Sequence, residues 1–159
     1  MARSETSPSR VVVDTNVLVS RALTPTGPPA RVVDLVLTGQ VVACYDRRIV
    51  AEYRAVLLRP RFGFDHAAVD SLLALIAHEG LSVIPPPVPL DLPDESDRPF
   101  AEVALATGAW LVTGNLKHFP GLDRAVSPAD FLRLDQAERR RLSCHYPAVT
   151  FPGPGRSSQ

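Results

Sequence analysis

Acidic side chains occur at positions in this sequence where the local pattern predicts apolar surroundings. In the stretch RVVVDTNVL, Asp14 ends a run of three valines, and apolar residues soon resume after it. Asp97 heads the segment DRPFAEVALATG, whose helical periodicity places its side chain between Ala101 and Ala104 on the inward arc. Glu52 lies at the margin of an apolar stripe in the predicted helix RRIVAEYRAVLLRP. Oxygen ligands without a matching His or Cys cluster are suited to Mg²⁺ or Mn²⁺.

Burial of these carboxylates raises an energetic problem that a cation would solve. Unpaired like charges are costly to bury, and two neighbouring carboxylates normally force one of them to take up a proton. A divalent cation removes that cost, can lower the pKa of a bound water and can stabilise negative charge on a phosphate. The pattern therefore predicts metal-dependent phosphate chemistry, provided that Asp14, Glu52 and Asp97 meet in the fold.

Each residue also has a simpler interpretation. An aspartate before a threonine, as in Asp14-Thr15, is typical of a turn or a helix N-cap, and Asp97 could be the N-cap of its own helix. Glu52 alone could pair with a neighbouring arginine, and Asn115 could be an ordinary turn residue. Their shared position at predicted strand ends favours the functional interpretation.

The segments that must position these side chains alternate between two patterns. Buried strands are predicted in RVVVD, VVACYD, LSVIP and AWLVT, with an edge strand at 125–126. Helices are predicted in NVLVSRAL, PPARVVDLVLTG, RRIVAEYRAVLLRP, DHAAVDSLLALIAHEG, residues 97–108 and the short segment SPADFLRL. This alternation predicts a three-layer α/β domain with a central, mainly parallel sheet flanked by helices. Ligands of such sheets bind beyond the carboxyl ends of the strands, where Asp14 and the turn from Thr113 to Asn115 are expected.

The same periodicity separates the remaining acids near Asp97 from the predicted site. Arg98 and Glu102 are four residues apart on the opposite side of the helix, so they are expected to form a solvent-facing pair. Asp94 and Glu95 fall in the Pro-rich segment PPPVPLDLPDES, which is predicted to be an extended surface loop. We do not include them among the ligands.

Length and composition describe one ordinary globular domain. The chain has 159 residues, 45% of them apolar, and its 17 basic and 17 acidic residues balance, so net charge indicates no partner. Apolar runs are too short to span a bilayer and the N-terminus lacks the apolar core of a signal peptide, so a cytoplasmic protein without membrane contact is expected. We expect a flexible leader at 1–9, the domain at 10–134, and a charged, then Pro- and Gly-rich, tail at 135–159 that frays.

Three segments together resemble a known family. VVVDTNVLVS, IVAEY and DRPFAEVALATGAWLVTGNLKHF resemble the PIN-domain family, in particular the VapC-type toxins of bacterial toxin-antitoxin pairs. AVSPADFL resembles the end of the subgroup that carries TGNLKHFP, so the resemblance runs in order over about residues 10–134. It implies a metal-dependent endoribonuclease with Mg²⁺ or Mn²⁺ at an acidic cluster. It also implies a homodimer and a cognate antitoxin whose tail silences the active site.

Carried over by position, the resemblance assigns residues to this site. Asp14 matches the first acid, Glu52 the helix glutamate and Asp97 the acid before the helix, while Asn115 stands where many members have aspartate. We expect Asp14 and Asp97 to hold the cation, Glu52 to complete the site or orient the attacking water, and Asn115 to position a water or the scissile phosphate. His118 also stands where many such toxins have aspartate, and it stays unassigned, an exposed loop histidine being the simpler interpretation.

Further polar residues are expected around the acids. Thr15 and Thr113 are predicted to hydrogen-bond the carboxylates and orient them. Arg47, Arg48 and Arg54 are candidate RNA contacts, in a segment that also holds Arg59 and Arg61. A solvated helix face explains the arginines equally well.

Rival functions lack their own signatures. A haloacid-dehalogenase-like phosphatase needs a second aspartate two residues after the first, where this chain has Asn16. A Rossmann dinucleotide binder needs a glycine-rich turn after the first strand, and DTNVLVS has none. The competing hypothesis is a PIN-like domain that binds RNA or a partner protein without cutting, because Asn115 and His118 depart from the acidic pattern.

Overall fold

Five short parallel strands form one sheet at the centre of the molecule. The structure is a computed structural model, of which we describe residues 8–145, with side chains to residue 138. The strands are β1 (Arg10–Val13), β2 (Val42–Tyr45), β3 (Leu81–Ser82), β4 (Trp110–Val112) and β5 (Ala125–Val126). Their order is β3-β2-β1-β4-β5, and all neighbouring pairs are parallel. The predicted three-layer α/β architecture is confirmed, and every predicted strand is present.

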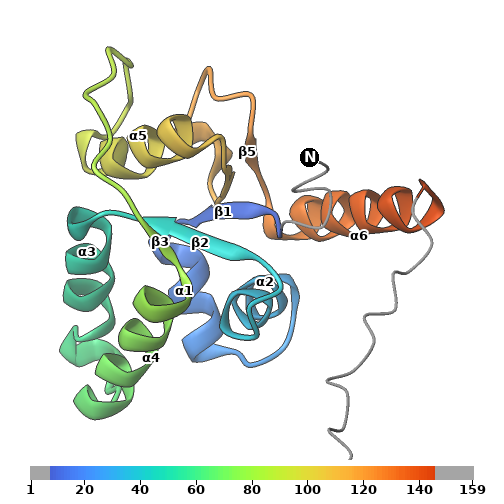
Figure 1. Ribbon diagram of the computed structural model, residues 1–159. Helices are drawn as coiled ribbons and strands as arrows, with labels where there is room; N and C mark the ends of the chain where they lie inside the picture. The colour runs from blue at the N-terminus through green and yellow to red at the C-terminus, as the bar shows by residue number, and fades with distance from the viewer. Residues whose placement is uncertain (1–7, 146–159) are drawn as a thin grey trace, which may run out of the picture.

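Helices cover the sheet on both faces (Figure 1). The helices drawn below the sheet are α1 (Thr15–Leu23), α2 (Pro28–Leu37), α3 (Arg47–Leu57) and α4 (His66–Glu79). Above it lies α5 (Arg98–Thr107), and α6 (Pro128–His145) follows β5 and extends to the right. Three single 3₁₀ turns complete the elements: η1 (Pro60–Phe62), η2 (Glu95–Asp97) and η3 (Leu116–His118).

The last helix is longer than predicted. The sequence indicated a short helix in SPADFLRL and a fraying tail from 135, whereas α6 runs to His145 and Asp135 is buried within it. The predicted domain boundary at 134 therefore falls inside a helix. The first three turns of α6 pack beside α2, and that tertiary contact stabilises a segment whose polar sequence gives little helical signal. Residues 146–159 of the predicted tail and 1–7 of the leader lie outside the described residues.

Local signals in the sequence explain where the helices begin and end. Asp65 caps α4 as predicted, since its side chain accepts a hydrogen bond of 3.1 Å from the Ala68 backbone N–H. Gly80 follows the last residue of that helix. Only glycine fits there, because a Cβ would lie 2.5 Å from the backbone oxygen of Ala43. The chain can therefore turn directly from α4 into β3.

Strand β1 lies at the centre of the sheet, and its carboxyl end positions Asp14. Val11 and Val12 are fully buried, and Val13 is in register with Val112 of β4. The chain leaves β1 for β2 on one side, while β4 lies on the other side, so the topological switch point is between β1 and β4. Asp14 and Thr113 follow these two strands directly and emerge side by side at the switch point.

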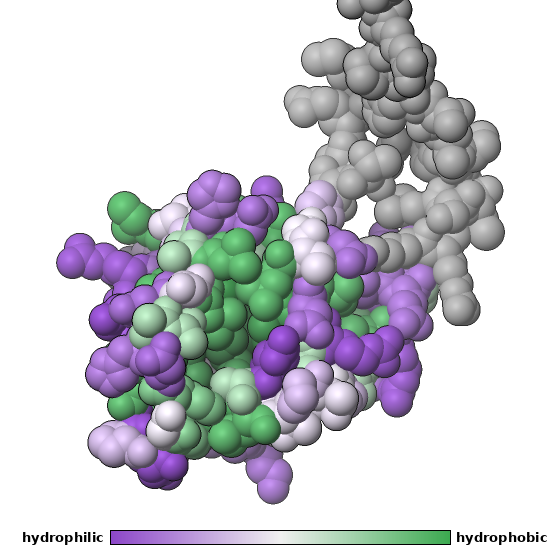
Figure 2. All heavy atoms as spheres, turned by 90° about the horizontal axis from the view of Figure 1, so that it is seen from below, coloured by the Kyte–Doolittle hydropathy of each residue, from purple (hydrophilic) through white to green (hydrophobic). Residues whose placement is uncertain are grey.

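The outer face of the lower helices is partly apolar. Figure 2 shows the molecule from below, where apolar side chains gather in a central hollow with polar side chains around it. Leu23 of α1 and Leu75 of α4 are 56% and 41% exposed. Within residues 8–145, none of the helices combines the length and the apolar character that crossing a bilayer requires.

Candidate metal centre

Asp14 lies at the end of β1 with both carboxylate oxygens engaged. Oδ1 accepts a 2.8 Å hydrogen bond from the Thr15 backbone N–H, which makes Asp14 the N-cap of α1. Oδ2 accepts a 2.7 Å hydrogen bond from the hydroxyl of Thr113. The side chain is 6% exposed. The capping interpretation is therefore confirmed, and the second oxygen faces β4, where the predicted site would lie.

Glu52 reaches the same end of the sheet from α3. The hydroxyl of Thr15 donates a hydrogen bond to Glu52 Oε2, and the hydroxyl of the neighbouring Tyr53 donates one to the backbone oxygen of Val13. Tyr53 was expected only as part of the apolar stripe, and its hydrogen bond is a function that the sequence did not reveal. These two contacts fix α3 against the end of β1.

Asp97 is the third acid, and one of its oxygens has no hydrogen-bond partner. It occupies the N-cap position of α5 but makes no capping hydrogen bond, so the simpler interpretation of this residue is wrong. Asp97 is 8% exposed, and its buried Oδ2 accepts no hydrogen bond within the described structure. His118 Nδ1 approaches that oxygen at 2.9 Å without hydrogen-bond geometry. A buried, unsatisfied carboxylate oxygen is rare in folded proteins.

The three carboxyl groups all have a raised pKa. Burial is the main cause of the raised pKa of Asp14, Glu52 and Asp97, and the charge of Asp14 adds to the effect at the other two. The pKa of Asp97 rises to about 6. The hydroxyls of Thr113 and Thr15 oppose the rise at Asp14 and Glu52 respectively, since they donate hydrogen bonds to the charged forms. Asp14 therefore lies within electrostatic reach of both Glu52 and Asp97, while their joint role as a site stays a prediction.

The Pro-rich loop beside the site is held against α5. The guanidinium of Arg98 donates hydrogen bonds to the backbone oxygens of Val88 (2.7 Å) and Leu90 (2.6 Å), and it pairs with Glu95. Asp94 caps η2 by accepting from the Ser96 N–H at 2.9 Å. Asp94 adds negative charge near Asp97 and Glu52, while its own oxygen is engaged within the loop.

The prediction that Glu102 faces solvent is wrong. Glu102 is 4% exposed, accepts a 3.0 Å hydrogen bond from the Val88 N–H, and pairs at 2.9 Å with Arg48 of α3. Arg48 also pairs at 2.7 Å with Asp46, which is 4% exposed and caps α3. Helical periodicity could not identify this network, because the partner that stabilises Glu102 lies 54 positions away in the chain.

The predicted RNA-contacting arginines have different surroundings. Arg48 is engaged by the two acids just described, and Arg54 pairs with Asp70 of α4. Arg47 is exposed at the first turn of α3. The charge of Arg59 lowers the pKa of Glu52, so this arginine lies within electrostatic reach of the site.

The turn after β4 carries two further residues toward the acids. The Asn115 N–H donates a 3.0 Å hydrogen bond to the Thr113 hydroxyl, and the Gly114 N–H donates one of 3.3 Å to Asn16 Oδ1. The Asn115 side chain does not cap η3. His118, which the sequence left unassigned, ends η3 beside Asp97. The available signals were its place in the loop after a strand end and the aspartate that many toxins of the resembling type have at this position.

The donor chemistry of this site fits a divalent cation. In the described part of the chain, no three His, Cys, Asp or Glu side chains are grouped closely enough to hold a metal ion by themselves. Mg²⁺ is nevertheless commonly bound by one or two carboxylates together with waters and substrate phosphates. Asp97 Oδ2 supplies a buried acceptor without a hydrogen bond, and Asp14 supplies a neighbouring charge. Asp14 and Asp97 are the two carboxylates that would hold such a cation together with waters, and a ligand role for Glu52 stays a prediction.

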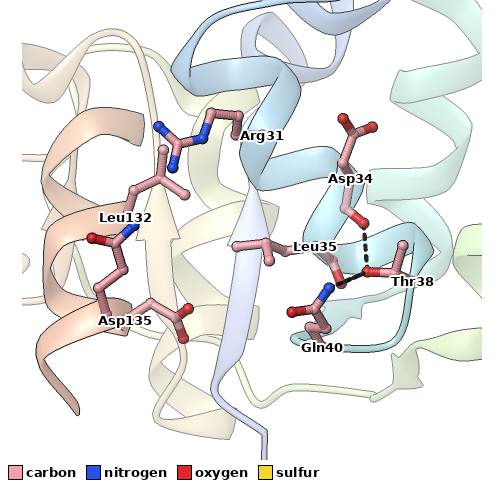
Figure 3. A pocket seen from close by; sticks show the side chains of 8 residues that line it. Arg31, Asp34, Leu35, Thr38, Gln40, Leu132 and Asp135 are labelled. Carbon is pink, nitrogen blue, oxygen red and sulfur yellow. Dashed lines mark hydrogen bonds between the residues drawn. The ribbon is translucent and has the colours of Figure 1, made fainter. Parts of the chain in front are cut away.

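A cavity of the described structure lies away from these acids. A cavity of about 340 Å³ opens between α2 and α6, lined by residues that include Arg31, Leu35, Leu132 and Asp135 (Figure 3). Thr38 at its edge donates a 2.8 Å hydrogen bond to the backbone oxygen of Asp34. None of the acids described above lines this cavity, so its size does not make it the candidate site.

The comparisons with known proteins agree with this geometry. A parallel α/β sheet with acids beyond its strand ends is the arrangement of a nuclease-like domain. Residues 10–117 match the PIN domain family, and the chain belongs to that family. PIN domains are typically metal-dependent nucleases. The chain is also 29% identical over 118 residues to the uncharacterized protein MJ1680 of Methanocaldococcus jannaschii, covering 72% of this chain and 76% of that protein. No solved structure matches the chain.

Proposed function

We propose that this PIN domain is a Mg²⁺- or Mn²⁺-dependent endoribonuclease that hydrolyses RNA phosphodiester bonds in the cytoplasm, as the toxin of a toxin-antitoxin pair. The observation that carries the proposal is Asp97, whose buried Oδ2 lacks a hydrogen bond while its pKa is raised to about 6 by burial and by Asp14. A protein gains nothing in stability from such an arrangement. Binding of an external cation would compensate the buried charge of Asp97.

The residues have separate roles in the proposed hydrolysis. A bound divalent cation would lower the pKa of a water and stabilise the negative charge of the phosphate. Asp14 and Asp97 bind the cation, and Thr113 holds Asp14 in orientation through its hydroxyl. Glu52, oriented by Thr15, completes the site or orients the attacking water. Asn115 in the next turn positions a water or the scissile phosphate.

RNA must approach a centre of negative charge, so basic side chains beside the site support the proposal. Arg47 is exposed at the start of α3, and Arg59 at its end acts on the charge of Glu52. Guanidinium groups bind phosphates with paired hydrogen bonds. Arg48 and Arg54 would reach RNA only beside the ion pairs that they already make.

The partners implied by a toxin are part of the same proposal. A cognate antitoxin or a second copy of the chain would need an apolar surface to bind. The hollow in Figure 2, with Leu23 and Leu75 exposed on the same set of helices, supports the presence of such a surface.

Cleavage of a mixed RNA pool tests the enzymatic part of the proposal. We expect cutting with Mg²⁺ or Mn²⁺ and no cutting with EDTA. The cleavage rate should fall by about 1,000-fold or more in Asp14→Asn, because this variant loses a ligand of the cation that stabilises the charge of the transition state. Asp123→Asn is the matched control, since Asp123 is an exposed acid after η3. A wild-type protein that binds the RNA and leaves it intact with either ion would contradict the nuclease and favour the binding domain.

A further inference from the structure

We propose that His118 is a ligand of the divalent cation, which makes the site a mixed oxygen and nitrogen centre that prefers first-row transition ions to Mg²⁺. This inference rests on the proposed metal-dependent function, because it names a ligand and an ion class for the same site. Nothing in the sequence pattern required it, since the expectation for His118 was an exposed loop histidine.

The separation of two donor atoms carries the inference. His118 Nδ1 lies 2.9 Å from Asp97 Oδ2. Two donors bound about 2.1 Å from one ion and at a right angle to each other would lie about 3.0 Å apart. The nitrogen and the oxygen are therefore spaced as adjacent ligands of a common ion.

A simple ion pair explains the contact less well. An imidazole that served to neutralise Asp97 would direct its N–H at the carboxylate, as charge-assisted hydrogen bonds do. At Asp97 Oδ2 the ring is close enough to lower the pKa of the carboxyl, yet the contact lacks the geometry of a hydrogen bond and the oxygen is buried. The side chain of His118 is 40% exposed, so the pair also remains accessible to an ion from solvent.

The loop holds the His118 backbone in place. The His118 N–H donates a 3.1 Å hydrogen bond to the backbone oxygen of Asn115, and the Phe119 N–H donates one of 3.1 Å to that of Leu116. Thr113 before the loop is fully buried and Phe119 at its end is 2% exposed. Both anchors lie in the core, so the imidazole starts from a fixed position, as a ligand must.

The ligand set determines which ion is preferred. Mg²⁺ favours oxygen ligands and gains little affinity from imidazole. First-row transition ions bind imidazole well, and the affinity of a given site is higher for Co²⁺ than for Mn²⁺. With Asp14 and Asp97 alone, the site would discriminate weakly. With His118 beside Asp97 as the adjacent pair of ligands and waters completing the coordination, the affinity for Co²⁺ should depend on the imidazole, and the affinity for Mg²⁺ should not.

Two measurements on the untagged full chain test this proposal. Pulsed EPR of bound Mn²⁺ should show coupling to a ¹⁴N nucleus in the wild type and in the control His78→Ala, and none in His118→Ala. Calorimetric titration should show that His118→Ala lowers the affinity for Co²⁺ by about 10-fold or more, while the affinity for Mg²⁺ changes by less than about 3-fold. His78 is a suitable control because its side chain is 83% exposed and its contact is to Glu79 in α4.

The outcomes separate this proposal from the nuclease proposal. Mn²⁺ binding without nitrogen coupling, or coupling and Co²⁺ affinity that persist in His118→Ala, overturns the ligand role even if RNA is cut. Nitrogen coupling that disappears in His118→Ala supports the ligand role even if no RNA is cut, in which case only the nuclease proposal fails. No binding of Mn²⁺ or Co²⁺ by the wild type overturns both.

Discussion

Two groups of buried acids, each with one member in α5 or at its N-cap, have opposite kinds of partner. Asp46 and Glu102 share the guanidinium of Arg48, and Glu102 also accepts from a backbone N–H. Asp14 accepts a hydroxyl and a backbone hydrogen bond, whereas Asp97 has the imidazole of His118 beside it. Among the side chains that the structure describes, no arginine or lysine pairs with Asp14 or Asp97. The two groups differ in whether a permanently charged side chain compensates them.

The difference separates a structural acid from an acid that awaits a ligand. Arg48 completes its network within the chain, so that network ties α3 to α5 without outside help. In the second group, burial and the charge of Asp14 raise the pKa of Asp97 to about 6 although His118 lowers it, so compensation there is incomplete. A buried acid is therefore a functional candidate here only where its neutralising charge is missing.

The largest effect should come from removing the internal cation. Arg48→Met leaves Asp46 and Glu102 buried without a positive partner, so we expect a loss of about 3 kcal/mol in the free energy of unfolding. Urea denaturation measures it. Arg54→Met is the matched control, because its pair with Asp70 is about half exposed and its loss should cost less than about 1 kcal/mol. Equal losses in the two variants would mean that the buried network is not structural.

Removing the hydroxyl that orients Asp14 should weaken the other group. In Thr113→Val the carboxylate loses its 2.7 Å hydrogen bond from the side chain, and Mn²⁺ affinity should fall by about 10-fold or more. Thr107→Val removes a hydroxyl that donates to the backbone of α5 instead, so its Mn²⁺ affinity should match the wild type. Calorimetric titration compares the variants, and an unchanged affinity in Thr113→Val would contradict the orienting role.

Neutralising an acid of the second group should stabilise the metal-free protein. Asp97→Asn removes a negative charge that burial and Asp14 disfavour, and we expect a gain of about 1 kcal/mol at pH 7 after allowance for solvent screening. Thermal unfolding in EDTA measures the gain. A clear loss of stability would show that the Asp97 carboxylate is already compensated within the fold.

The smallest effect is the dependence of that gain on pH. The pKa of Asp97 rises from 3.8 to about 6 on folding, so between these values the folded protein binds more protons than the unfolded chain. Stability should therefore fall as pH rises from about 4 to 6, and the deficit should be complete above pH 6. The difference between Asp97→Asn and the wild type should thus shrink as the pH is lowered from 7 to 4. A difference that stays constant over this range would exclude the raised pKa.

The sequence predicted the local parts of this picture. Periodicity was sufficient to place Asp97 on the inward arc of its helix and to bring Asp14 to a strand end, because both depend on the repeat of a single element. The parallel α/β fold followed from the alternation of β-branched runs with amphipathic segments. The length of α6 did not follow, because the contact that stabilises this helix is with α2, a distant segment of the chain.

Contacts between distant segments could not be predicted. Glu102 was expected in solvent because its own helix gives no sign of Arg48, and the geometry that brings the two together is set by the order of the strands. His118 was left unassigned for the same reason, since a loop position does not reveal which residue it will face. Pattern reading identifies the face on which a side chain lies, whereas the identity of its partner is a property of the fold.

Titration with Mn²⁺ tests the central claim most directly. We expect the wild type to bind Mn²⁺ and to gain stability with its concentration, by about 2.7 kcal/mol at 100 times the dissociation constant. The double variant Asp14→Asn with Asp97→Asn should lose this binding while folding normally, and Asp123→Asn should retain it. A double variant that binds Mn²⁺ as tightly as the wild type would show that these acids do not form the cation site.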